Sequence, residues 1–168
     1  MGIKIQLGNI VDLKVDAIVN AANNYLKSGG GVCGAIFNAA GIELAYECNE
    51  HKYCETGSAI ITRGYHLPAK YVIHAVGPIF DEDPIKAPLL LKSAYLRSLE
   101  LTVLNELKTV AFPCISTGIF GYPQNEAAEI AISTVKGFLE KNKLEVIFCC
   151  FKEDDYQIYK SLIKNIGV

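Results

Sequence analysis

The chain has 168 residues, of which 51% are hydrophobic and 20% charged, and its formal net charge is −2. This length lets one domain bury a core without disulfides or metals, and so small a charge gives no electrostatic reason to expect a nucleic-acid or membrane partner. With no signal-peptide pattern and no apolar run of membrane-spanning length, we expect one cytoplasmic domain over 1–168.

Short β-type runs alternate with longer segments of helical periodicity, without a repeat or a low-complexity linker. The elements predicted in chain order are a strand over 3–7, a strand over 16–20, a helix over 34–51 interrupted near Gly41, strands over 58–64 and 70–76, a helix over 88–107, a strand over 109–113, a helix over 125–142, a strand over 144–151 and a helix over 154–166. Asp154 is the predicted N-cap of the last helix.

This alternation within one domain predicts an α/β fold, a three-layer α/β/α sandwich around a largely parallel sheet. Ligands of such folds bind outside the carboxyl ends of the strands. The segments that follow the strands are therefore the place to look for a site.

The segment "SGGGVCGAI" follows the second strand and precedes a helix. Consecutive glycines let backbone amides approach a ligand closely, and a helix N-terminus adds a favourable dipole for an anion. The sequence lacks the Lys-Ser/Thr pair of a P-loop and the spacing of a dinucleotide-binding motif. A plain strand–helix connector remains the alternative interpretation.

A second loop of this kind, "CISTGIFGYP", follows the fifth strand. It combines hydroxyls, glycines and apolar side chains: Ser116, Thr117, Gly118, Ile119, Phe120 and Gly121. Its amides are suited to wrapping phosphates while Ile119 and Phe120 exclude water, although a turn before a helix has the same composition. Two such loops at one sheet edge favour a clamp around a diphosphate.

Polar and aromatic residues at the other strand ends extend this hypothesis. Asn23 is the candidate ligand of ribose hydroxyls, whereas Asn20, next to the strand, is expected to be structural. Asn9 could offer an amide to a purine edge. Phe151 ends an apolar strand, where it would either stack on a base or belong to the core.

The cysteines and histidines give weaker signals. The six cysteines, at positions 33, 48, 54, 114, 149 and 150, show no C-x-x-C spacing and are interpreted as mostly structural thiols. His74 lies within a predicted strand and is expected to be a core histidine. We predict no metal site and no cofactor, because no metal-ligand spacing is present.

Taken in order, several segments resemble the macro domain family, the ADP-ribose-binding modules, and within it the MacroD-like branch. They are "GNIVDLKVDAIVNAAN", "GGGVCGAIFNAAG", "GSAIITRGYHLPAKYVIHAVGPI", "AFPCISTGIFGYP" and "VIFCCFKEDDYQIY". Together they run from Gly8 to about Tyr159. The resemblance implies a mixed, mostly parallel sheet of six strands, with ADP-ribose or an ADP-ribosylated protein as partner. We expect the domain to be a monomer.

The resemblance also implies a role for individual residues. Adenine would lie near Asn9 and Ile10 and stack on Phe151, and Asn23 would meet the distal ribose. The diphosphate would be held by Gly31, Val32 and the loop from Ser116 to Gly121. The distal ribose would also meet the glycine run Gly29, Gly30 and Gly31.

Three positions depart from the family pattern. Asn9 stands where "GDI" has Asp, and its amide oxygen can still accept a hydrogen bond from an adenine amino group. MacroD-like hydrolases typically read "GGGVDGAIH", where this chain has Cys33 and Phe37. Their Asp is thought to activate or position water, so Asn23 and Cys33 are the catalytic candidates here.

Two hypotheses on function stay open. The first is an enzyme that removes ADP-ribose from acidic side chains or deacetylates O-acetyl-ADP-ribose. The second is a reader that binds ADP-ribose without turnover, which the loss of the Asp and the His favours. A different nucleotide or RNA binder using the same cleft is a third reading, disfavoured by the charge balance.

Overall fold

The structure is a computed structural model that describes residues 2–165. Its strands are β1 (Ile3–Leu7), β2 (Ala17–Ala21), β3 (Ala59–Arg63), β4 (Tyr71–Ala75), β5 (Thr109–Phe112) and β6 (Glu145–Cys150). Its helices are α1 (Gly31–Ala40), α2 (Ile42–His51), α3 (Ala87–Leu104), α4 (Gln124–Leu139) and α5 (Glu153–Asn165), with short 3-10 turns η1 (Ile10–Asp12) and η2 (Phe80–Glu82).

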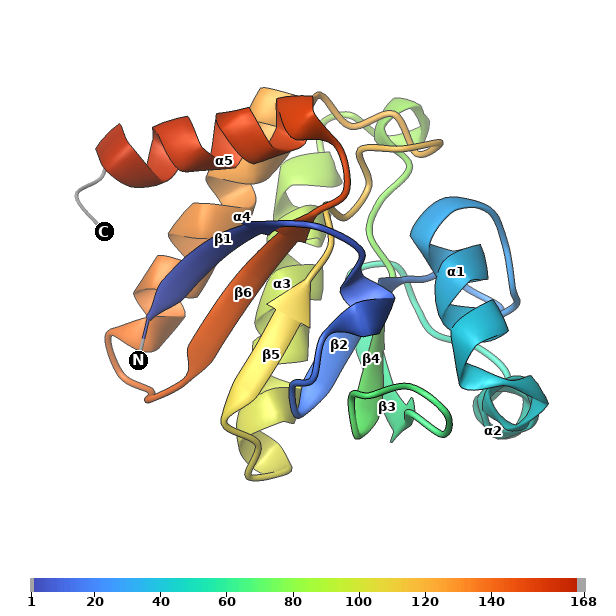
Figure 1. The fold of residues 1–168 in the computed structure, drawn as a ribbon. Coiled ribbons are helices and arrows are strands. Elements are labelled where there is room, and N and C mark those ends of the chain that lie inside the picture. The colour runs from blue at the N-terminus through green and yellow to red at the C-terminus, as the bar shows by residue number, and fades with distance from the viewer. Residues whose placement is uncertain (1, 166–168) are drawn as a thin grey trace.

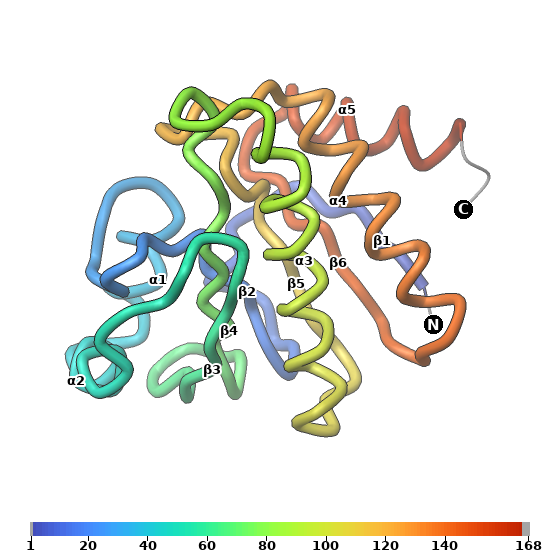
Figure 2. Tube along the Cα trace, turned by 180° about the vertical axis from the view of Figure 1, so that it is seen from behind, coloured from blue at the N-terminus to red at the C-terminus, as the bar shows by residue number. Residues whose placement is uncertain are grey.

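The six strands form one sheet in the order β1-β6-β5-β2-β4-β3. Every neighbouring pair is parallel except β3 and β4, which pair antiparallel. Buried residues of α3, α4 and α5 pack on one face of the sheet, and those of α1 and α2 pack on the other (Figures 1 and 2). The predicted three-layer α/β/α architecture is confirmed.

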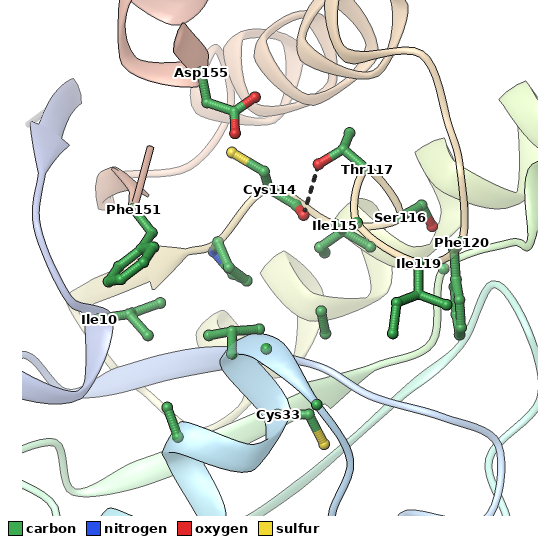
Figure 3. A pocket seen from close by; sticks show the side chains of 18 of the residues that line it. Ile10, Cys33, Cys114, Ile115, Ser116, Thr117, Ile119, Phe120, Phe151 and Asp155 are labelled. Carbon is green, nitrogen blue, oxygen red and sulfur yellow. Dashed lines mark hydrogen bonds between the residues drawn. The ribbon is translucent and has the colours of Figure 1, made fainter. Parts of the chain in front are cut away.

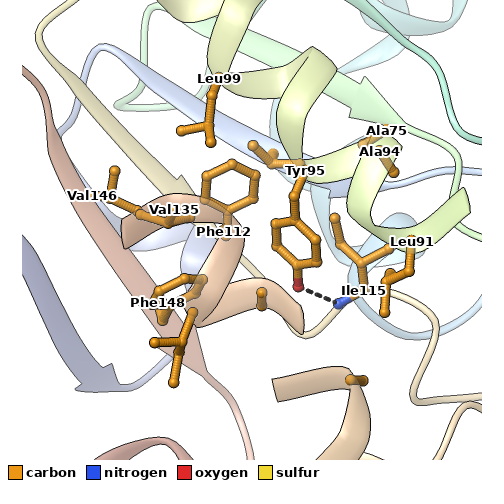
Figure 4. Packing of buried hydrophobic residues seen from close by; sticks show 14 of the residues in the cluster. Ala75, Leu91, Ala94, Tyr95, Leu99, Phe112, Ile115, Val135, Val146 and Phe148 are labelled. Atoms are coloured by element: carbon orange, nitrogen blue, oxygen red, sulfur yellow. Dashed lines mark hydrogen bonds between the residues drawn. The ribbon is translucent and has the colours of Figure 1, made fainter. Parts of the chain in front are cut away.

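The larger core cluster also supports one loop at the sheet edge (Figure 4). The ring of Tyr95, from α3, packs at 5.1 Å from that of Phe112 on β5. The Tyr95 hydroxyl accepts a hydrogen bond from the Ile115 amide at 3.3 Å and donates to the Pro113 carbonyl at 3.4 Å. A buried aromatic side chain therefore fixes the start of the loop that follows β5.

Strands and helices lie within a few residues of their predicted positions, with two informative details. The predicted helix over 34–51 is divided at Gly41, whose φ of 92° is a conformation that glycine adopts without strain. The predicted N-cap at Asp154 is wrong, because α5 already begins at Glu153 and Asp154 lies in its first turn. The last residue of that predicted helix, 166, lies outside the described residues.

Within residues 2–165, none of the helices has the length and apolar character needed to cross a membrane.

Candidate ligand-binding site

A pocket of about 610 Å³ opens at the carboxyl edge of the parallel strands. Its walls come from the segments that follow β1, β2, β4, β5 and β6, together with the first turn of α1 and the start of α5 (Figure 3). This volume is in the usual range for small-molecule sites, about 300–1,000 Å³. The position is the one expected for a ligand of a doubly wound α/β sheet.

The pocket brings together all but one of the residues predicted from the sequence. They are Asn9, Ile10, Asn23, Gly29, Gly30, Gly31, Val32, Cys33, Ser116, Thr117, Gly118, Ile119, Phe120 and Phe151. Gly121 does not line the pocket. With φ at 73° it closes the turn behind the loop, where its amide donates to the Gly118 carbonyl at 3.0 Å.

The glycine run brings the N-terminus of α1 to the pocket. Gly30 is the N-cap of α1, no side chain caps the helix, and Gly31 and Val32 form its first turn along the pocket wall. Free amides and the helix dipole at such an end attract an anion. Gly34 has a packing reason to lack a side chain, because a Cβ there would lie 2.4 Å from the Gly29 carbonyl oxygen.

The opposite wall is a strained loop. Ser116 has φ at 69°, an uncommon conformation for a residue with a side chain. Its hydroxyl is buried, and no hydrogen-bond partner for it is found among residues 2–165. A Cβ on Gly77, which follows β4, would lie 2.2 Å from that hydroxyl. The loop therefore packs against Gly77 more closely than a residue with a side chain would allow without a shift.

Asn23 is held by its own loop. Its Nδ2 donates to the Lys27 carbonyl at 2.8 Å, and its Oδ1 accepts from the Lys27 amide at 3.0 Å. An Asn side chain has a second amide hydrogen and a second carbonyl lone pair. The carboxamide is therefore fixed in orientation and retains capacity for a ligand.

The thiol of Cys33 is buried at 5% exposure and turns away from the centre of the pocket (Figure 3). It donates to the Lys27 carbonyl at 3.4 Å, and the Asn20 Nδ2 donates to it at 3.7 Å. Burial raises the pKa of Cys33, so the neutral thiol predominates at neutral pH. In this geometry Cys33 ties α1 to the β2–α1 loop.

Beneath Cys33 lies a buried polar cluster on β2, β3 and β4. His74 contacts the Asn20 amide nitrogen at 3.1 Å through Nδ1 and the Thr62 hydroxyl at 3.0 Å through Nε2. Its side chain is fully buried, which lowers its pKa to about 3. Phe37 packs nearby, 6.3 Å between ring centroids. The predictions of a core His74 and a structural Asn20 are confirmed.

At the other end of the pocket, Phe151 leaves β6 with 75% of its surface exposed. It lies next to Ile10, and both side chains line this end of the pocket (Figure 3). The Asn9 Oδ1 caps η1 by accepting from the Val11 amide at 3.2 Å. Phe151 is therefore not a core residue, the alternative that the sequence left open.

Part of the wall next to α5 was not predicted from the sequence. Cys114, Gln124 and Asp155 line the pocket there, and the Gln124 Nε2 donates to the Asp155 carboxylate at 2.8 Å. Burial raises the pKa of Asp155. The pair "DD" at 154–155 gave only a helix-start signal, since nothing local distinguishes the buried from the exposed carboxylate. Gly77 was a detectable signal, because it directly follows a predicted strand.

Among residues 2–165, no three His, Cys, Asp or Glu side chains are grouped as metal ligands. The six cysteines are all free.

The fold and the pocket define a three-layer α/β/α domain with a ligand site at the carboxyl edge of its sheet. The chain belongs to the macro domain family, which it matches over residues 19–131. It is 52% identical over 162 residues to ADP-ribose glycohydrolase MACROD1 of Rattus norvegicus, covering 94% of this chain and 63% of that protein. Relatives of this kind place it in the MacroD-like branch.

Other relatives differ in how much longer they are than this chain. The chain spans 52% of mouse MACROD1 and 38% of Xenopus laevis MACROD2. It is 50% identical to a macro domain-containing protein of Mesorhizobium japonicum, covering 94% of this chain and 90% of that one. Thus the similarity covers only part of the longer relatives.

Two solved structures are similar over nearly the whole chain. The Oceanobacillus iheyensis macrodomain with ADP superimposes with a TM-score of 0.93 at 42% identity, covering 97% of this chain and 90% of that one. The Trypanosoma brucei macrodomain in complex with ADP-ribose gives 0.91 at 41% identity, covering 96% and 68%.

Proposed function

We propose that this chain binds ADP-ribose in the pocket and hydrolyses ADP-ribosyl esters, either on acidic side chains of proteins or in O-acetyl-ADP-ribose. The observation that carries the proposal is the pair of amide-rich loops facing each other across one pocket, with Phe151 exposed at its end. Relatives named ADP-ribose glycohydrolase, at about half identity, support the same assignment.

In this proposal the ligand lies along the pocket with its adenine between Ile10 and Phe151. The diphosphate lies between the first turn of α1 and the Ser116–Phe120 segment, both of which line the pocket. Asn23 binds the distal ribose with the amide hydrogen and lone pair that Lys27 leaves free.

The catalytic step assigned here is attack by water on the ester carbonyl or on the anomeric carbon of the distal ribose. Water adds, the ester C–O bond breaks, and a free carboxylic acid and ADP-ribose leave. Asn23 is the positioning residue for ribose and water. Cys33, buried, neutral and donating to Lys27, holds the loop rather than acting as a nucleophile.

Binding is tested first by calorimetry and thermal unfolding with free ADP-ribose. A saturating ligand should raise the melting temperature, since it binds only the folded state. The absence of both heat and thermal shift at millimolar ligand would remove the proposed function altogether.

Turnover is tested by release of label from an auto-ADP-ribosylated transferase. We expect release by the wild type, loss of release in Asn23→Ala, and near-normal release in Cys33→Ala. Cys33→Asp supplies a carboxylate at the position where the MacroD-like pattern has one, and a general base of this kind contributes about 100-fold or more when well placed, so release should be faster.

The second candidate function is a reader without turnover, and Cys33 is the observation that favours it. The wild type would then bind ADP-ribose without releasing label from the ADP-ribosylated transferase, whereas Cys33→Asp would release it. This result would establish that the chain has retained the binding cleft and lost the hydrolase activity.

A further inference from the structure

Two exposed tyrosines lie against each other on the outer side of the β2–α1 loop (residues 22–30). Tyr25 is 64% exposed and Tyr53, just beyond α2, is 49% exposed. Their ring centroids are 5.3 Å apart and the rings are inclined at 71°, an edge-to-face contact. Such a contact leaves much of both rings open to a further partner.

The backbone around Tyr25 is built to keep this ring outside. Leu26, the next residue, is only 2% exposed and has φ at 59°, a left-handed conformation that is rare for a residue with a side chain. Leu26 thus anchors the loop in the core while its neighbours Tyr25 and Lys27 point to solvent. Backbone strain of this kind persists where surrounding structure enforces it, and it gathers at functional sites.

Hydrogen bonds fasten the loop to the segment after α2. The Cys54 amide donates to the Asn24 carbonyl at 2.8 Å, and the Asn24 Nδ2 donates to the Cys54 carbonyl at 2.9 Å. The Lys27 Nζ donates to the Asn49 Oδ1 at 2.6 Å. We call the surface formed by Tyr25, Lys27, Asn49 and Tyr53 the tyrosine rim. It is a braced surface that needs little ordering on binding.

The inner side of the same loop is the pocket wall. Asn23, Gly29 and Gly30 line the pocket, and Tyr25 and Lys27 lie between them in the chain. Under the proposed function the distal ribose is held here, so whatever is bonded to that ribose leaves the pocket beside this loop. The tyrosine rim lies on the outer side of this same loop.

We propose that the tyrosine rim binds the polypeptide that carries the ADP-ribosyl group, with an apolar or proline side chain next to the modified residue packed against Tyr25 and Tyr53. The inference rests on the proposed function and adds to it a contact with the protein chain outside the ADP-ribose pocket. Tyrosine is one of the residues enriched at protein–protein interfaces and at their binding hot spots. The net charge of −2 argues against a nucleic acid in this place.

The test compares two ligands on the same variants. One is free ADP-ribose; the other is a peptide of about ten residues bearing ADP-ribose through a non-hydrolysable linkage on a glutamate analogue beside a proline. We expect Tyr25→Ala/Tyr53→Ala to weaken the peptide conjugate about tenfold or more, as tyrosine hot spots do, and to leave the affinity for ADP-ribose unchanged. Leu104→Ala, 78% exposed at the end of α3, is the matched control for both ligands.

The two arms separate the possible failures. Equal affinity of the double variant and the wild type for the conjugate overturns the role of the rim, whereas absence of wild-type binding to free ADP-ribose overturns the proposed function beneath it. A wild-type dimer in sedimentation that the double variant loses would show that the rim contacts a second copy instead, which also overturns the proposal. Equal melting temperatures of the variants verify that they are folded.

Discussion

Gly34 leaves no space for a side chain, although it lies inside α1. A Cβ there would lie 2.4 Å from the Gly29 carbonyl oxygen, a backbone atom that moves only with the loop. We expect Gly34→Ala to lower the free energy of unfolding by about 1–3 kcal/mol, as other overpacked sites do, and to weaken ligand binding by shifting the glycine run.

The matched variant for this measurement is Gly137→Ala in α4. Nothing lies within 4 Å of a Cβ at that position, so the alanine should stabilise the helix by about 0.5–1 kcal/mol. Urea unfolding of both variants measures the two changes in the free energy of unfolding, which should have opposite signs. Equal stability of Gly34→Ala and the wild type would contradict the contact with Gly29.

His74 makes stability depend on pH. Burial, with a smaller contribution from the charge of His51, lowers its folded pKa to about 3 from the ordinary histidine value of 6.5. Below pH 6.5 the unfolded chain therefore binds a proton that the folded chain does not. Stability should fall as the pH drops from 6.5 toward 3, by up to about 1.4 kcal/mol per pH unit.

The measurement is urea unfolding at pH 7, 6 and 5 for the wild type and for His74→Gln. The variant removes the titrating group, so its slope between pH 7 and 5 should be flatter. Parallel pH profiles of the two proteins would assign the dependence to other groups.

Individual residues of the pocket differ in whether they could be predicted from the sequence. The two glycine-rich loops and Asn23 could be predicted because each follows a strand and carries residue types with few alternative uses. Asp155 and Gln124 could not, because their position in the wall depends on how α4 and α5 meet at the sheet edge. That is a tertiary relation with no local pattern.

At the scale of elements, the junction of β6 and α5 bears a ring that the core does not use. Because Phe151 is 75% exposed, Phe151→Ala should leave the free energy of unfolding nearly unchanged. Loss of a stacked base costs about 1–3 kcal/mol, so the affinity for ADP-ribose should fall by about five- to 150-fold.

Phe151→Tyr keeps the ring and should keep the affinity, which calorimetry measures on the same ligand. Ile85→Ala, removing another exposed apolar side chain (91%), is the control. If Phe151→Ala bound ADP-ribose as tightly as the wild type, the proposed placement of adenine at this end of the pocket would be wrong.

The order of elements was predictable because strands and helices alternate with clear periodicity, and their ends were predicted less well. Asp154 is instructive: an acidic residue near a helix start fits either the N-cap or the first turn, and the chain uses the second. At Gly41, by contrast, the backbone has a positive φ. A glycine within a helical pattern indicates such a position, so the break between α1 and α2 could be predicted.

For the whole molecule, the sheet separates two cores of buried residues. Ile36 of α1 belongs to one and Leu99 of α3 to the other, and both are fully buried. We expect Ile36→Val to cost about 0.5–1.5 kcal/mol and Leu99→Ala about 2–5 kcal/mol. The double variant should show their sum within about 0.5 kcal/mol, because residues on opposite faces share no contact.

Denaturant unfolding followed by fluorescence and by circular dichroism measures these values. Coincident transitions with the two probes are required for the sum to be meaningful. A coupling well above 0.5 kcal/mol would mean that strain passes through the sheet from one core to the other.

The two glycine-rich loops also approach each other across the top of the pocket. Ile119 is 92% exposed, yet its Cδ1 lies 4.0 Å from where a Cβ on Gly30 would be. A diphosphate held below such a bridge has to be threaded past it, both on entry and on exit. We therefore expect the bridge to affect the residence time of the ligand more than its affinity. Ile119→Ala should raise the association and dissociation rate constants together.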